Sequence, residues 1–413
     1  MATTLFTNIG QLINVREQDE LLRGKALGDL PVIKDSWLLV EGDRISAYGF
    51  MRTIPQNLSA VKNSVDLSGR MILPAWCDSH THLVFAASRE EEFVDKIKGL
   101  TYAEIAAKGG GILNSAAKVR DAREDELFNA AWKRLEQISK MGTGAVEIKS
   151  GYGLSTEGEL KMLRVIKKLK EKSPLLIKST FLGAHTYPQQ YKSDHQGYIK
   201  IIIEEMLPQI ASEKLADYVD VFCEKDFFSP EETIRICRAA QVHGLKAKLH
   251  ANQLHCSGGV EAGVAVNALS VDHLESMDEN AIRSLSNAST IGTLLPLAAF
   301  FLRMQYPPAR KLIEAGAALA IASDYNPGSS PCGNMNLVLA MSCIQMKLLP
   351  EEAINAATIN GAYAIELQNE VGSIQKGKKA NLIITTPVPS VAYLPYSFGE
   401  NWIDRVMING EFI

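Results

Sequence analysis

The stretch MILPAWCDSHTH, residues 71–82, ends an apolar run with two histidines that one threonine separates. Successive side chains of a β-strand point to opposite faces, so His80 and His82 would share one face while Thr81 points away. One metal ion can bind two imidazoles placed in this way at the carboxyl end of a strand. A His-x-His motif alone is weak evidence, because histidine pairs without a metal are the common alternative. The chain has eight histidines, and several others also close apolar segments.

Composition places the chain among ordinary globular enzymes. Of its 413 residues, 46% are hydrophobic and 22% are charged. The net charge of −4 gives no basic field, so we expect neither a nucleic-acid nor a membrane partner. Six cysteines without a CxxC pair favour a reducing compartment. The start has no signal-peptide pattern and no run of about twenty apolar residues occurs, so we predict a cytoplasmic protein.

The middle of the chain alternates strand-like with helix-like segments. A capping box, TYAE at 101–104, precedes a helical pattern over 124–140, and a second box, SPEE at 229–232, opens a helix that ends near Gly244. We interpret Gly109–Gly111 as a loop at the barrel mouth, since it lacks the Lys-Ser/Thr partner of a phosphate loop. Eight strands in such an alternation predict a (β/α)₈ barrel. The predicted strands are 71–77, 144–149, 176–184, 218–223, 246–249, 269–272, 290–295 and 318–322.

Both ends of the chain are rich in short strands. Residues 37–49 suggest a hairpin with its turn at 41–44, and 405–413 suggest another. We therefore predict a small composite β-sandwich domain formed by residues 1–70 together with 366–413. Residues 71–365 would form the barrel domain.

Polar residues close nearly every predicted barrel strand, and the carboxyl ends of the strands are where barrels carry their chemistry. We assign His80, His82, His250 and Asp324 to one metal, because three imidazoles and one carboxylate leave room for water. His273 and Asp324 are the candidate acid–base residues. The alternatives are a hydrogen-bonded core histidine for His273 and ordinary turn chemistry for Asp324.

Several of these motifs together resemble the amidohydrolase superfamily, and more closely its imidazolonepropionase family. The resemblance spans nearly the whole chain and is carried by residues 74–82, 82–93, 147–154, 181–185 and 323–329. It implies metal-dependent hydrolysis of the cyclic amide 4-imidazolone-5-propanoate to N-formimidoyl-L-glutamate, in histidine degradation. It also implies a homodimer.

The resemblance assigns substrate contacts as well. Arg89 would bind the propanoate, because a guanidinium matches a carboxylate in a bidentate fork; the alternative is a salt bridge to Glu90–Glu92. His185 would contact the ring, and Tyr152 and Tyr102 would donate hydroxyl hydrogen bonds unless they only pack. The carboxylate end would also be held by residues of a single turn, Asn326, Gly328 and Ser329.

One position departs from the family pattern. Many members carry an acid where this chain has Gln253, and an amide cannot act as a base, so we expect Gln253 to hydrogen-bond the substrate. Glu224 and Lys225 leave a second metal open, although the resemblance favours one. Zinc and iron both suit three histidines and an aspartate. A nucleobase deaminase of the same superfamily and a hydrolase-like binding protein that has lost its metal are the alternative functions.

Overall fold

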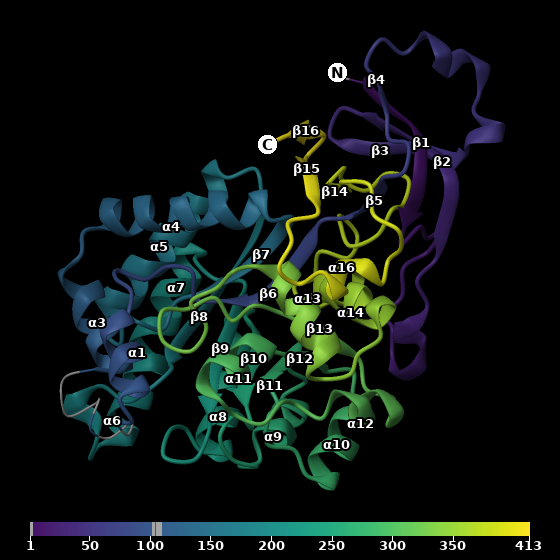
Figure 1. Ribbon diagram of the computed structural model, residues 1–413. Coiled ribbons are helices and arrows are strands. Elements are labelled where there is room, and N and C mark those ends of the chain that lie inside the picture. The colour runs from purple at the N-terminus through teal and green to yellow at the C-terminus, as the bar shows by residue number, and fades with distance from the viewer. Residues whose placement is uncertain (1–2, 101–103, 105–109) are drawn as a thin grey trace.

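The computed structural model describes residues 3–100, 104 and 110–413, and its central feature is a parallel barrel with helices around it (Figure 1). Neighbouring barrel strands follow one another in chain order from β6 to β13. The ring closes after β13, where the amide of Asp324 donates to the carbonyl of His80 over 3.0 Å and that of His82 donates to Tyr325 over 2.9 Å. The predicted (β/α)₈ barrel is therefore confirmed. Its strands are β6 (Trp76–Thr81), β7 (Thr143–Lys149), β8 (Leu176–Ala184), β9 (Tyr218–Cys223), β10 (Lys246–Ala251), β11 (Ser270–His273), β12 (Ile291–Leu294) and β13 (Leu319–Ile321).

Local sequence signals explain where the helices begin. The Ser229 hydroxyl accepts from the amide of Glu232 while the Glu232 carboxylate accepts from the amide of Ser229, which is the predicted capping box. The predicted helix over 124–140 is confirmed, whereas the predicted box at 101–104 lies outside the described residues except for Glu104. The helices are α1 (Glu90–Ile97), α3 (Ile112–Asp121), α4 (Glu124–Lys140), α5 (Thr156–Lys172), α6 (His195–Ile201), η5 (Ile202–Met206), α7 (Leu207–Glu213), α8 (Pro230–Val242), α9 (Gly259–Ala265), α10 (Glu279–Ser286), α11 (Pro296–Leu302), α12 (Ala309–Glu314), α13 (Met335–Ile344), α14 (Pro350–Ala357), α15 (Ile359–Tyr363) and α16 (Tyr393–Tyr396).

The two ends of the chain meet in a second sheet beside the barrel (Figure 1). Its order is β16-β15-β14-β5-β1-β2-β3, with β4 paired to β1, and β14 from the C-terminal part runs antiparallel to β5. Apolar side chains from both ends, such as Phe6 and Leu382, share one buried core. The domain bounds at 70/71 and 365/366 remain a prediction. The strands are β1 (Thr3–Ile13), β2 (Val32–Glu41), β3 (Arg44–Phe50), β4 (Ser64–Asp66), β5 (Met71–Pro74), β14 (Leu382–Thr385), β15 (Ile403–Ile408) and β16 (Glu411–Phe412).

The first predicted barrel strand, 71–77, is wrong in its extent. Met71–Pro74 is β5 of the terminal sheet, and the barrel strand β6 begins at Trp76. Proline has no amide hydrogen to continue a ladder. After it, the amide of Ala75 donates to Asn381 of the terminal region and that of Trp76 donates to Gly142 at the barrel, over 2.9 and 2.8 Å. The chain thus passes from one sheet to the other at this point, and His80 comes to lie within β6.

Candidate metal centre and substrate cavity

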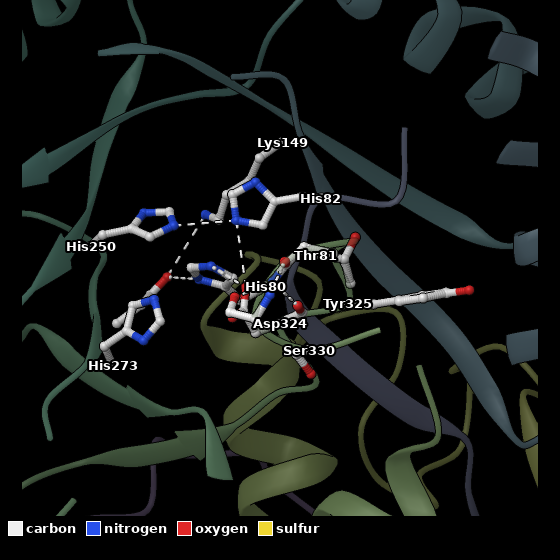
Figure 2. Close-up of polar contacts among 12 residues, drawn as sticks. His80, Thr81, His82, Lys149, His250, His273, Asp324, Tyr325 and Ser330 are labelled. Carbon is white, nitrogen blue, oxygen red and sulfur yellow. Dashed lines mark hydrogen bonds and ion pairs between the residues drawn. The ribbon is translucent and has the colours of Figure 1, made fainter. Parts of the chain in front are cut away.

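Four predicted ligands converge at the carboxyl end of the barrel (Figure 2). Asp324 Oδ1 lies 3.6 Å from the Nε2 atoms of both His80 and His82, and His82 Nε2 lies 3.2 Å from His250 Nε2. All four side chains are at most 4% exposed. Ligand atoms held about 2.0–2.1 Å from a tetrahedral zinc ion lie about 3.3 Å from one another. The spacing of these donor atoms therefore fits one metal ion.

The state of the histidines fits a metal as well. Burial, followed by the charges of neighbouring groups, lowers the pKa values of His80 and His82 well below the usual histidine value, which keeps both imidazoles neutral. His80 Nε2 is buried and has no hydrogen-bond partner among the residues that the structure describes. A buried polar atom without a partner costs free energy, and a metal ion would remove that cost.

Two carboxylates hold the Nδ1 atoms of two of these imidazoles. Asp272 Oδ2 lies 2.6 Å from Nδ1 of His80, and the Asp220 carboxylate lies 3.0–3.1 Å from Nδ1 of His250. A carboxylate at Nδ1 places the proton there and leaves Nε2 free to bind a metal. The pKa of Asp220 is lowered, since the charges of His250 and Lys149 outweigh the opposing effect of burial.

A buried ion network lies beneath these carboxylates. Lys149 Nζ contacts Glu147 at 2.7 Å, Asp220 at 2.8 Å and Asp272 at 3.8 Å, and all of these side chains are fully buried. Lys248 Nζ contacts Glu147 at 3.0 Å. Burial would lower the pKa of Lys149, but the three carboxylates raise it above its usual value. Lys149 is therefore a buried cation that joins the supports of two candidate ligands.

Strained backbone helps to aim the acid–base candidates. Asp324 has φ +54° and His273 has φ +88°, conformations that cost a residue other than glycine about 1–3 kcal/mol. The Ser329 hydroxyl donates to Asp324 Oδ2 over 3.2 Å. His273 Nδ1 lies 3.4 Å from Glu275; burial would lower the pKa of His273, but Glu275 and the nearby aspartates raise it. His273 is thus brought beside the four predicted ligands, and its ligand atom clusters with those of His80 and Asp324.

A cavity of about 910 Å³ is lined by three of the predicted metal ligands, His82, His250 and Asp324. Gly110 and Gly111 line it, in agreement with a loop at the barrel mouth, whereas Tyr102 lies outside the described residues. The described substrate-binding candidates all line this cavity: Arg89, Tyr152, His185, Gln253, Asn326, Gly328 and Ser329.

The guanidinium of Arg89 has a carboxylate partner within the protein. Its Nε donates to Glu92 Oε2 over 2.9 Å, and Glu92 Oε1 accepts from the amide of Gly111 over 3.0 Å. Arg89 also packs on Gly328, where an added Cβ would lie 2.2 Å from Nη1. The salt bridge weighed as an alternative for Arg89 is therefore present, with Glu92, and it holds the guanidinium at the cavity.

Glu159 stabilises the loop that carries Tyr152, one of the residues expected to contact the substrate ring. The buried Glu159 carboxylate accepts from the amides of Gly151, Gly153 and Leu154 over 2.8–3.0 Å, which fixes the loop carrying Tyr152. The rings of His185 and His82 stack with centroids 5.4 Å apart. Burial and the neighbouring His250 lower the pKa of His185 to about 3, so its ring is neutral.

Glu224 is engaged in loop structure. One of its oxygens accepts from the amide of Leu254 over 2.8 Å and the other from that of Lys225 over 2.9 Å. The clusters of histidine and acidic side chains suited to a metal among the described residues do not contain Glu224. Within the same part of the chain, no helix has the length and apolarity needed to cross a membrane.

No role was predicted from the sequence for several residues of this site. Asp220, Lys248 and Glu159 were not singled out, and Glu147, Lys149 and Asp272 received no role. The signal available was a charged residue inside an otherwise apolar strand, as in YVDVFC at 218–223 and KAKLHA at 246–251. Inside a barrel strand such a residue must pair with an opposite charge.

Comparison with known proteins shows the family of the chain. The sequence signature described as the Amidohydrolase family matches residues 71–413. The chain is 53% identical to an imidazolonepropionase of Christiangramia forsetii over 100% of both chains, and 54% identical to one of Flavobacterium johnsoniae over 99% of this chain and 100% of the relative.

Solved structures with low sequence identity share the fold. A guanine deaminase from C. acetobutylicum has a TM-score of 0.71 at 15% identity over 100% of both chains. An adenosine deaminase from Xanthomonas campestris with bound zinc has a TM-score of 0.69 at 16% identity, covering 99% of this chain and 92% of that one. With the barrel, the histidine-rich centre and the full-length relatives in agreement, the chain belongs to the amidohydrolase family and, within it, to the imidazolonepropionases.

Proposed function

We propose that the chain hydrolyses the cyclic amide of 4-imidazolone-5-propanoate to N-formimidoyl-L-glutamate, a step of histidine degradation. The observation that carries this proposal is that one cavity is lined both by Arg89 and by His82, His250 and Asp324, three of the four predicted metal ligands. The reaction breaks the bond between the ring carbonyl carbon and a ring nitrogen and forms a new carbon–oxygen bond. Water supplies the oxygen, and its proton goes to the leaving nitrogen.

One divalent metal, zinc or iron, would be held by His80, His82, His250 and Asp324. Bound there, it would make water acidic enough to attack at neutral pH and would polarise the carbonyl under attack. Asp272 and Asp220 orient two of these imidazoles through Nδ1, so their Nε2 atoms are available as ligands.

The protein's own groups move the proton. Asp324 would accept it through Oδ2, since Oδ1 faces His80 and His82 while Oδ2 accepts a hydrogen bond from the Ser329 hydroxyl. His273, held by Glu275, would carry a proton to the leaving ring nitrogen. Gln253 would hydrogen-bond the substrate at the cavity wall.

The tail and the ring of the substrate would contact different residues that line the cavity. Arg89 would form charge-assisted hydrogen bonds with the propanoate, next to the turn of Asn326, Gly328 and Ser329. Tyr152 and His185 would pack beside the ring. A nucleobase has no anionic tail, so the buried guanidinium of Arg89 favours the carboxylate substrate over a deaminase reaction.

The test is turnover by purified protein with measured metal content, on imidazolonepropanoate, cytosine, dihydroorotate and N-acetyl amino acids. We expect turnover of imidazolonepropanoate alone, and we expect His80→Ala, His82→Ala and His250→Ala each to lose metal and activity together. Turnover of cytosine instead, or an inert protein with a full complement of metal, would overturn the proposal.

A further inference from the structure

We propose that Lys96 is a second cation for the carboxylate tail of the substrate, and that it adds a positive charge beside the ion pair of Arg89 with Glu92. This inference rests on the proposed function, because it assumes an anionic tail beside Arg89. Lys96 lies two turns after Arg89 on α1, and both residues line the same cavity.

The first argument is charge balance. Arg89 is paired with the Glu92 carboxylate, and both side chains are 10% exposed, so together they present no net charge to a ligand. Lys96 has no carboxylate within 4.0 Å over the described ranges 3–100, 104 and 110–413. Its charge therefore makes the subsite net positive.

The second argument is geometry at one glycine. Lys96 Nζ donates to the carbonyl of Gly328 over 3.3 Å, and the Arg89 guanidinium packs against the Cα of the same residue. A carboxylate held by Arg89 at Gly328 thus lies beside the Lys96 ammonium. An ammonium on a flexible four-carbon stem can turn from a carbonyl to a carboxylate without moving the backbone.

The third argument is that the surroundings of Lys96 disfavour its positive charge. Burial, and then the charge of Arg89, lower the pKa of Lys96 from its usual value. The ring centroid of Phe301 lies 5.7 Å from the ammonium, near the outer limit of a cation–π contact, so it offsets little of the cost of burial. An anion between the two cations would relieve their repulsion, and a neutral tail would not.

Lys96 could instead serve only to hold the Gly328 turn, and two variants separate these roles. Lys96→Gln keeps a hydrogen-bond donor for the Gly328 carbonyl but removes the charge, and Lys96→Met removes both. Lys98→Met is the matched control, since Lys98 is exposed at the end of the same helix and does not line the cavity.

The experiment measures dissociation constants by calorimetry on the metal-loaded protein. The probes are imidazole-4-propanoate and its propanamide, neither of which contains the amide bond to be hydrolysed. We expect Lys96→Gln and Lys96→Met each to weaken propanoate binding about tenfold, as for the loss of one partly solvated charge-assisted hydrogen bond. Propanamide binding should change less than about twofold, and Lys98→Met should behave like the wild type.

Other results of this experiment would overturn the proposal or separate it from the proposed reaction. If Lys96→Gln binds the propanoate like the wild type while Lys96→Met does not, Lys96 holds the turn and the proposal is overturned. Equal weakening of both probes, or a wild type that binds both probes alike, also overturns it. The wild type could bind the propanoate more tightly than the propanamide, lose this preference in the Lys96 variants, and still not hydrolyse imidazolonepropanoate. In that case the proposed reaction fails while the role of Lys96 in binding the carboxylate stands.

Discussion

Lys149→Met tests whether the buried lysine organises the metal centre. The substitution keeps most of the side-chain volume and removes a fully buried charge. The Lys149 ammonium lies 2.7 Å from Glu147, 2.8 Å from Asp220 and 3.8 Å from Asp272. Without it, the ion pairs of Lys149 with Asp220 and Asp272 are lost, while Lys248 still pairs with Glu147 at 3.0 Å.

Two magnitudes follow from these contacts. Removing one partner of a buried ion pair costs about 3–5 kcal/mol, a large share of the roughly 5–15 kcal/mol that stabilises a domain. The metal should be affected too, because Asp220 and Asp272 would lose the cation that keeps them beside His250 and His80. Loss of such support typically costs 10–100-fold in metal affinity.

The assay combines thermal unfolding of the metal-free protein with metal affinity from competition against a chelator. Lys248→Met is the matched control, since its ammonium contacts Glu147 at 3.0 Å and two backbone carbonyls but, within the described part of the chain, forms no ion pair within 4.0 Å with Asp220 or Asp272. Both variants should lose stability, and Lys149→Met should lose far more metal affinity. If Lys149→Met does not fold, Asp272→Asn takes its place, because it keeps the shape beside His80 and removes the charge. Equal losses of metal affinity in the lysine variants, or unchanged affinity in Asp272→Asn, would refute the reasoning.

Three further predictions concern substrate binding and thiol chemistry. Arg89→Met should reduce kcat/KM for the carboxylate substrate by roughly thirty- to a thousand-fold, about 2–4 kcal/mol, and should slow an amide-tailed analogue far less; an equal loss on both would make Arg89 structural. Gln253→Ala should lower kcat/KM about tenfold and leave the pH dependence of the rate unchanged, since an amide does not titrate; a shifted acidic limb in the pH profile would count against this role. Burial raises the pKa of Cys77 to about 12 and that of Cys223 to about 11, so alkylation of the native protein at pH 8 should label the exposed Cys256 first, as mass spectrometry would show; early labelling of the buried thiols would contradict their burial.

The barrel could be predicted because its strands are apolar runs of ordinary length between well-capped helices. The strand containing His80 was misplaced, since the apolar run 71–77 belongs to two sheets and a single periodicity cannot show where the chain leaves one for the other. The pairing of β5 with β14 depends on residues about 300 apart in sequence, which local patterns do not encode.

The site was predictable where one motif carries the chemistry. His80, His82, His250 and Asp324 each close a predicted strand, so the barrel geometry alone brings them together. The ion pairs of Lys149 join side chains from three separate strands, β7, β9 and β11. Local sequence patterns do not show which strands face one another, so these pairs became visible only in the folded chain. The ion pair of Arg89 with Glu92 was weighed as an alternative to substrate binding, and the structure has both the pair and the cavity.

The proposed reaction requires that His80, His82, His250 and Asp324 hold a metal, which would supply the activated water for hydrolysis of the ring amide. The most direct measurement is turnover of imidazolonepropanoate in water enriched in heavy oxygen, with the protein stripped of metal by a chelator and then reloaded. We predict no turnover after stripping, and recovery after reloading with one equivalent of metal. The product should be N-formimidoyl-L-glutamate with one heavy oxygen in its α-carboxylate. Turnover by the stripped protein, or release of ammonia with the heavy oxygen in an N-formyl group, would contradict the account.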